Sequence, residues 1–141
     1  MNNRFKFRVW DETRKQLIYP ETNNPDINEN YFLLNQKGKV FCFDGNMLDD
    51  WSENFIIQQF TGLLDKDGNK IFEGDILFIN CNKNYTYKVI IKWLDGGLHA
   101  FEKINNEYSI EEGYTLNHEI GNTHEFSKII GNIFENPELL K

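Results

Sequence analysis

Apolar and polar residues alternate with a period of two along most of the chain, a pattern typical of β-strands that bury one face. Residues 4–10 read RFKFRVW, so the apolar side chains take one face and the basic side chains take the other. The polar stretch at 11–16 then predicts a turn, and residues 17–19 predict a returning strand. The chain therefore opens with an antiparallel hairpin.

A second hairpin is predicted by two apolar runs, at 31–34 and 39–43, that flank a short polar loop. Gly38 in that loop can supply the positive φ that a tight hairpin connection needs. Residues 46–54 follow, with apolar side chains at a helical spacing and carboxylates around them. This stretch predicts one short helix of at most two turns.

From residue 55 onward, short apolar runs alternate with tight turns. Strands are predicted at 55–64, 71–79, 87–93, 98–101 and 128–134. The second of these bends at Gly74-Asp75, and the turn before it has Gly68 as its left-handed residue. Asn136 as N-cap and Pro137 at the first helical position predict a final helical turn.

These elements predict a mainly β protein. We expect residues 1–60 to form a small antiparallel sheet. This sheet should pack on an SH3-like, partly open β-barrel formed by residues 61–141. We expect the core of the barrel to contain Phe78, Val89, Ile91, Ile130 and Phe134 or their immediate neighbours. We expect an architectural role for the glycines and polar residues at bends and strand ends, because they constrain backbone geometry. These are Gly62, Gly68, Gly74, Asp75, Gly131, Asn132, Asn136 and Pro137.

Charge and hydropathy narrow the class of protein. The chain has 141 residues, a net charge of −7 and 15% aromatic residues. Its acidity weighs against a protein that coats DNA or RNA, since phosphate binding needs clustered positive charge. No apolar run approaches the roughly 18–20 residues of a membrane span, and the first residues lack the apolar core of a signal peptide. We therefore expect a soluble, cytoplasmic protein without a membrane partner.

Metal and catalytic signatures are weak. Residues 65–69 resemble the start of a calcium loop, but Lys70 and Ile76 fall where an EF-hand needs glycine and a carboxylate. His118 and His124 are each followed by glutamate and lie six residues apart, although a zinc site needs three or four ligands. A metal-dependent enzyme around this pair is the weakest functional hypothesis. No hydrolase elbow, phosphate loop or dinucleotide fingerprint occurs, so we expect no enzyme activity and no cofactor.

Two non-catalytic hypotheses remain. The basic face of the first strand, Arg4, Lys6 and Arg8, could meet phosphate while Trp10 on the same side stacks on a base. The net charge favours the second hypothesis, a protein-interaction module. Residues 105–125 contain five glutamates and no lysine or arginine, and they predict a long exposed loop of the kind that often binds partners. Glu107, Glu111 and Glu112 are the candidate residues for an unidentified protein partner.

Three motifs resemble one known family. They are KFRVWD at 6–11, TGLLDKDGNKIFEGDI at 61–76 and IGNIFENPELL at 130–140. Together they are similar to the start, the central motif and the ending of the phage-associated YopX-like proteins, in the same order.

The resemblance implies a fold and a genomic setting. The family is encoded largely in phages and prophages of low-GC bacteria, and its biochemical function is not established. It therefore implies a phage or prophage accessory protein with a phage or host protein as partner, and it supplies no catalytic residues. The sequence does not indicate an oligomeric state.

Overall fold

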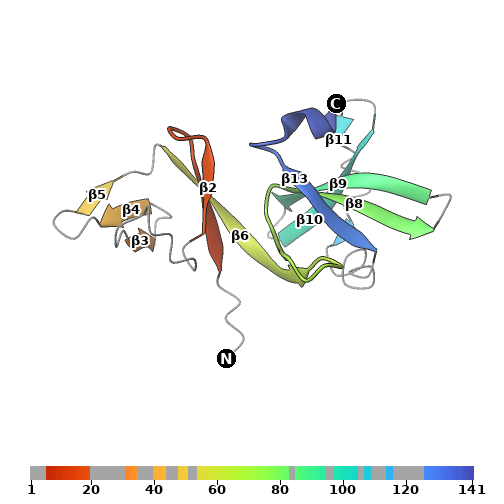
Figure 1. Cartoon of the computed structure of the whole chain (residues 1–141), viewed down its shortest axis with the longest axis horizontal. Helices are drawn as coiled ribbons and strands as arrows, with labels where there is room; N and C mark the ends of the chain where they lie inside the picture. The colour runs from red at the N-terminus through yellow and green to blue at the C-terminus, as the bar shows by residue number, and fades with distance from the viewer. Residues whose placement is uncertain are drawn as a thin grey trace. The chain divides into compact units, whose positions relative to one another are not determined.

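A computed structural model describes the side chains of residues 6–19, 54–80, 86–94, 97–102 and 126–141. Of residues 31–34, 40–43, 48–50, 81–82, 85, 103–104, 107–108 and 114–115 it describes the backbone alone. The described residues form antiparallel strands in three sheets, with a single 3₁₀ turn, η1 (Pro137–Leu140), after the last strand (Figure 1). The predicted mainly β class and the helical turn at the C-terminus are confirmed. No helix in this part of the chain is long and apolar enough to cross a membrane.

The chain forms two compact units, residues 7–58 and residues 1–6 with 59–141. The first unit begins with the predicted hairpin, in which β1 (Phe7–Asp11) pairs with β2 (Gln16–Ile18). The first residues of β6 (Phe55–Leu64) add the next strand to this sheet. The buried side chains of Val9, Ile18 and Phe55 form the hydrophobic cluster of this unit, because they share one face of the three strands.

The second predicted hairpin lies in the same unit. In it, β3 (Tyr31–Leu34) pairs with β4 (Val40–Phe43). The helix predicted over residues 46–54 is wrong where that stretch is described, because Leu48–Asp50 form strand β5 on the far edge of β4. A segment of two turns is marginal as an isolated helix, and pairing with β4 satisfies its backbone instead.

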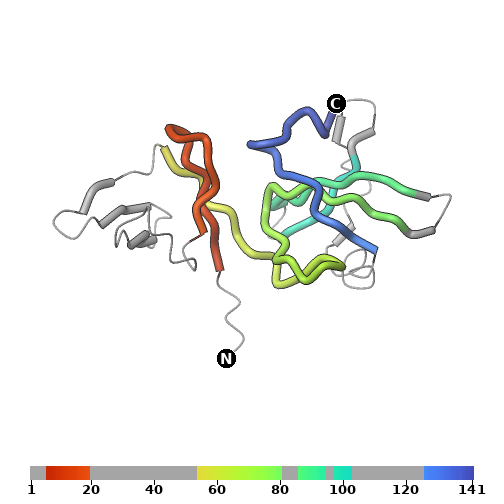
Figure 2. The backbone as a smooth tube through the Cα atoms, in the orientation of Figure 1, coloured from red at the N-terminus to blue at the C-terminus, as the bar shows by residue number. Residues whose placement is uncertain are grey.

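The second unit contains a curled six-stranded sheet, a half-barrel. The strand order is β11-β10-β9-β8-β13, and β12 also pairs with β10. Figure 2 shows the backbone of β13, in blue, crossing beside the green strands β8 and β9. The strands of this sheet are β8 (Asp75–Asn82), β9 (Tyr85–Leu94), β10 (Gly97–Ile104), β11 (Glu107–Tyr108), β12 (Tyr114–Thr115) and β13 (Ser127–Asn132). The unit also contains β7 (Lys70–Phe72), which pairs with β6 instead.

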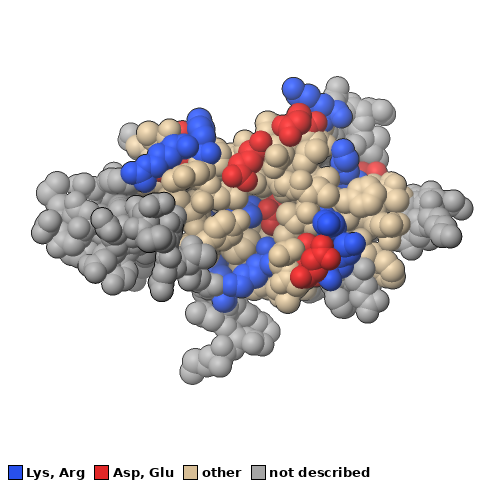
Figure 3. All heavy atoms as spheres, in the orientation of Figure 1, with Lys and Arg blue, Asp and Glu red and all other residues tan. Residues whose placement is uncertain are grey.

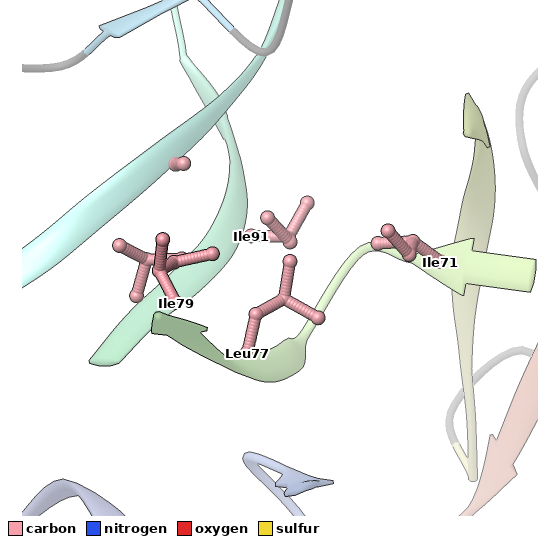
Figure 4. Close-up of a cluster of buried hydrophobic side chains, with 6 residues drawn as sticks. Ile71, Leu77, Ile79 and Ile91 are labelled. Atoms are coloured by element: carbon pink, nitrogen blue, oxygen red, sulfur yellow. The ribbon is translucent and has the colours of Figure 1, made fainter. Parts of the chain in front are cut away.

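The core of the half-barrel lies on its inner face. Figure 4 shows Leu77, Ile79 and Ile91 pointing toward one another, with Ile71 entering from a separate strand. Val89 and Ala100 complete the buried cluster. Val89 and Ile91 were predicted, whereas Phe78 is only partly buried and its neighbours Leu77 and Ile79 carry the burial. Ile130 and Phe134 are also partly buried, and Ile129 packs on the core.

The bend at Gly74-Asp75 joins several strands. Gly74 has φ +80°, a left-handed conformation in which a Cβ is strained. Its N–H donates to the carbonyl of Ile91 at 2.8 Å, and its own carbonyl accepts the N–H of Ile133 at 2.9 Å. The buried carboxylate of Asp75 accepts the N–H of Phe72 at 2.8 Å. The bend thereby connects β7 and β8, and its hydrogen bonds join it to β9 and to the residue after β13.

The turn between β6 and β7 closes the free edge of β13. The carboxylate of Asp65 is buried. Its Oδ1 accepts the N–H groups of Asp67 and Asn69, and its Oδ2 accepts the Asn69 side-chain amide and the N–H of Ile129. The N–H of Lys66 also donates to the carbonyl of Ser127 at 2.9 Å. One carboxylate therefore shapes the turn and holds it against β13.

Gly62 and Gly68, like Gly74, have positive φ. Gly62 lies where the β6–β7 pairing shifts between Phe60 and Leu64, and a glycine at such an irregularity keeps the strands paired on both sides. Gly68 takes the left-handed position in the turn that Asp65 shapes.

The end of β13 leads into a tight turn. Asn132 Oδ1 accepts the N–H groups of Phe134 and Glu135, each at 3.0 Å. Asn136 stands at the N-cap and Pro137 begins the helical turn, as predicted, but the Asn136 side chain does not cap it. That side chain turns back, and its Oδ1 accepts the N–H of Asn132 at 3.3 Å.

Replacing Gly74 by alanine tests the bend. We expect Gly74→Ala to lower the free energy of unfolding by about 1–2 kcal/mol, because alanine is strained at this φ. Gly97→Ala is the matched control, since a Cβ there meets the His99 ring at ordinary contact distances of 3.5 Å and more and no other atom of the described residues within 4 Å. Denaturant unfolding of both variants provides the measurement, and equal stability of the two would contradict the argument.

The pH dependence of Asp65 tests the turn. Burial raises the pKa of this carboxyl, but its hydrogen bonds from Asn69, Ile129 and Asp67 outweigh burial and hold the pKa below its ordinary value. Its contribution is therefore complete above the unfolded pKa of about 3.9 and lost as the pH falls through the lower folded pKa. Asp65→Asn should cost about 1–3 kcal/mol near neutral pH.

The stability difference between wild type and Asp65→Asn should shrink on acidification below roughly pH 4. Asp67→Asn is the control, because it changes only the Asp67 side chain, whose ion pair with Lys128 at 3.6 Å is exposed and of small energy. If the stability difference between wild type and Asp65→Asn stayed constant from neutral to acid pH, the negative charge of Asp65 would not be the source of its stabilising effect.

Candidate functional site

The residue that stands out on the surface of the half-barrel is Trp93. Side chains alternate along β9, so Trp93 faces the same way as the buried residues Val89 and Ile91. Unlike them it is 50% exposed. Its cross-strand partner Leu98 packs partly buried against the core cluster. The row of core residues on β9 thus continues into solvent at Trp93, one residue pair from the end of the β9–β10 ladder.

This arrangement is suited to contact rather than to bond chemistry. A tryptophan offers a large apolar surface together with one N–H donor. When such a side chain is anchored beside a packed core, it can bury against a partner at a small entropy cost. We define Trp93 and Leu98 as the rim of the half-barrel.

The opposite face of the same hairpin carries a polar pair. Lys92 of β9 lies directly opposite His99 of β10, and the His99 ring lies 6.1 Å from the ring of Phe101. Burial lowers the pKa of Lys92. No group of three or more His, Cys, Asp or Glu residues that could hold a metal ion occurs within the described ranges.

The predicted basic face is not a surface. Arg8 and Trp10 are each only 3% exposed, because both faces of β1 are covered in this unit. The Nε of Arg8 donates to Oε1 of Gln58 at 2.6 Å, and one of its terminal nitrogens donates to the Tyr19 hydroxyl at 3.5 Å. These two residues therefore cannot offer charge to phosphate or a ring to a base, which corrects the interpretation of the strand pattern.

Other candidates fall partly or wholly outside the described residues. Lys6 is partly buried, and Arg4 is not described. The continuous loop predicted over residues 105–125 is wrong where that stretch is described, because β11 and β12 both pair there with β10. Glu107 lies in β11, opposite Ile104, and its side chain is not described. Glu111, Glu112, His118 and His124 lie outside the described ranges.

A family model described as YopX protein matches residues 6–141. The chain belongs to the YopX protein family. Two solved structures share its fold over nearly their whole lengths. Protein EF1440 from Enterococcus faecalis is 28% identical, with 97% of this chain and 98% of that chain covered and a TM-score of 0.59.

Protein yopX from Bacillus subtilis is 19% identical over 100% of both chains, with a TM-score of 0.58. Among curated proteins, none matches the chain. The comparisons thus establish the family and the fold of this chain, and they name no ligand or partner.

Sequence reasoning did not single out Trp93. The alternation along residues 87–93 places Trp93 on the face of Val89 and Ile91, and the glycines that follow mark the end of the strand. These signals locate the side chain at the end of a core row. The exposure of Trp93 depends on the neighbouring strand β8. This strand begins only at Asp75, opposite the Ile90–Ile91 region of β9, and so does not extend alongside Trp93.

Proposed function

We propose that this member of the YopX protein family is a non-catalytic protein-interaction module, encoded by a phage or prophage, that captures a positively charged protein partner at the rim of the half-barrel. The half-exposed Trp93, at the end of an otherwise buried row, is the observation that carries the proposal. Tryptophan is among the residues most enriched at the energetic centres of protein interfaces.

Charge supports the chemistry of the partner. The net charge of −7 favours encounter with a basic protein and disfavours nucleic acid. Figure 3 shows basic and acidic side chains interspersed over the described part of the face that it draws. Long-range attraction therefore arises from the overall excess of carboxylates, while the apolar rim supplies short-range contact.

Truncating Trp93 tests the rim. We expect Trp93→Ala to weaken capture of the partner about tenfold or more, because residues at interface centres contribute at least this much. To identify the partner, the full chain would be immobilised on a resin and incubated with lysate of the bacterium that carries the gene. The purified partner would then be titrated against each variant by calorimetry.

Ile56→Ala is the matched control, since Ile56 is also a large exposed apolar residue but lies on β6 in the other unit. It should bind as the wild type does. Equal affinity of the Trp93→Ala variant and the wild type would refute the rim as the contact.

Reversing the charges of Glu107, Glu111 and Glu112 tests steering. The triple lysine variant should associate more slowly with the partner at low salt, and the deficit should fade as salt screens charges over roughly 10 Å. The thermal stability of the variant should equal that of the wild type.

A gel-shift experiment tests the nucleic-acid hypothesis. The wild type should not retard single-stranded DNA in a gel at physiological salt, and tight retardation would instead favour that hypothesis.

A further inference from the structure

The sheet of the half-barrel has a second face, turned away from the buried cluster that contains Leu77 and Val89. We call it the outer face. Ile76 of β8 and Ile90 of β9 lie opposite each other there, because neighbours along a strand point to opposite sides of a sheet. Ile76 is 0% exposed and Ile90 is 1% exposed, so this part of the outer face is covered.

The outer face reaches solvent one step further along the strands. The next row across the neighbouring strands β13, β8 and β9 (Figure 1) consists of Lys128, Phe78 and Lys88, since Phe78 pairs with both lysines. Both lysines are exposed, and Phe78 is partly buried. Side chains paired across antiparallel strands are close neighbours. This row therefore sets one aromatic ring between two side chains that end in ammonium groups.

The row beyond it is exposed as well. Asn80 of β8 pairs with Thr86 of β9, and both are exposed. The carbonyl of Phe126, just before β13, accepts the N–H of Asn80 at 3.0 Å, and Phe126 is 43% exposed. The two rows together carry two positive charges and no negative charge. We call these six residues the outer patch: Phe78, Asn80, Thr86, Lys88, Phe126 and Lys128.

The lysines of the outer patch are engaged in exposed contacts. The ammonium group of Lys128 forms an ion pair with Asp67 at 3.6 Å, in which 53% and 47% of the two side chains are exposed. The ammonium group of Lys88 donates to the carbonyl of Leu139 at 3.1 Å, also at the surface. Exposed ion pairs contribute little energy, and an ammonium group has three donors. Each lysine can therefore bind a further anionic group without the loss of a buried contact.

The charge of the outer patch is complementary to an anionic partner. The chain as a whole has a net charge of −7, which opposes the approach of a polyanion such as nucleic acid. Binding to phosphate chains also needs more clustered positive charge than two lysines supply. A short acidic segment of a protein needs only one cation for each of its carboxylates. The patch therefore fits such a segment better than it fits nucleic acid.

The spacing of the lysines defines the segment. Neighbouring strands lie about 4.8 Å apart, so the Cα atoms of Lys88 and Lys128, two strands apart, are separated by about 10 Å. In an extended peptide, every second side chain points the same way, at intervals of about 7 Å. Carboxylates four positions apart thus span about 13 Å, a distance that two long, flexible lysine side chains can bridge.

We propose that the outer patch binds an acidic segment of a partner protein, in which two carboxylates flank an apolar side chain at alternate positions. The carboxylates pair with Lys88 and Lys128. The apolar side chain packs on Phe78, with Phe126 at the diagonal position beside it. This surface lies on the opposite face of the sheet from Trp93, and it goes beyond the function proposed for the rim.

The test uses the full chain and the synthetic peptide acetyl-Glu-Ala-Phe-Ala-Glu-amide in an NMR titration. The amide resonances of Phe78, Lys88 and Lys128 should shift in a saturable manner, and binding should weaken as salt screens the charges. A peptide with lysine in place of both glutamates should cause no shifts. A peptide with alanine in place of the phenylalanine should bind about tenfold more weakly, because it loses the apolar contact.

Neutralising the two lysines tests where the peptide binds. Lys88→Gln combined with Lys128→Gln should lower the affinity for the peptide about tenfold, as expected for the loss of two exposed ion pairs. Arg14→Gln combined with Lys15→Gln is the matched control, because it removes the same charge from exposed side chains of the other unit. The control should bind as the wild type does. An equal loss in both double variants would mean that net charge alone attracts the peptide, and the proposal would be wrong.

Three further outcomes would also overturn the proposal. The absence of any saturable shift would show that the outer patch does not recognise acidic segments. If a single-stranded oligonucleotide shifted the same amides at lower concentration than the peptide, the patch would be a nucleic-acid site. If the chain associated with itself in sedimentation experiments, and the two lysine substitutions abolished this, the patch would be an interface between copies of the chain.

Discussion

The architecture of the half-barrel depends on one backbone constraint, the left-handed bend at Gly74. The amide and carbonyl of this residue bond to β9 and to the residue after β13, while the next side chain, Asp75, holds the end of β7. Strands from four parts of the sequence are thereby positioned by two residues. The bend also explains how Ile71, on a strand outside the six-stranded sheet, reaches the same core as Leu77 and Ile91.

A second constraint acts at the edge of β13. An unpaired strand edge invites pairing with other chains. Here Lys66 and Asp65 bond to Ser127 and Ile129 along that edge, and the Asn136 side chain takes the N–H of Asn132 further on. The edge is thus satisfied by a turn and a side chain rather than by a further strand. The edge of β13 is therefore protected from pairing with the strand of another chain.

Much of this fold follows from local pattern. The alternation of apolar and polar residues predicted both hairpins of the first unit, the longer strands of the half-barrel and the bend at Gly74. It did not predict β11 and β12, which lie in the stretch expected to form a loop. The pattern does not show whether the polar face of a strand is covered by other parts of the protein. Arg8 and Trp10 were therefore expected to be exposed, although both are buried. Leu48–Asp50 form β5 because pairing with β4 decides their conformation, and no local spacing of residues encodes that pairing.

Two further features depend on contacts between distant parts of the sequence. The hydrogen bond from Ile129 to Asp65 spans 64 residues, and Trp93 is exposed because of where β8 begins. Both are properties of the assembled sheet.

The late position of β13 has a consequence for synthesis on the ribosome. The strand pairs with β8, whose apolar residues emerge some fifty positions earlier in the chain. While residues 127–132 are still being made, β8 lacks one of its neighbours and the Asp65 turn has no edge to bind. Such long-range pairing is slow to form and leaves an open strand edge in the nascent chain. The half-barrel therefore closes only after residues 127–132, which complete it, have left the ribosome.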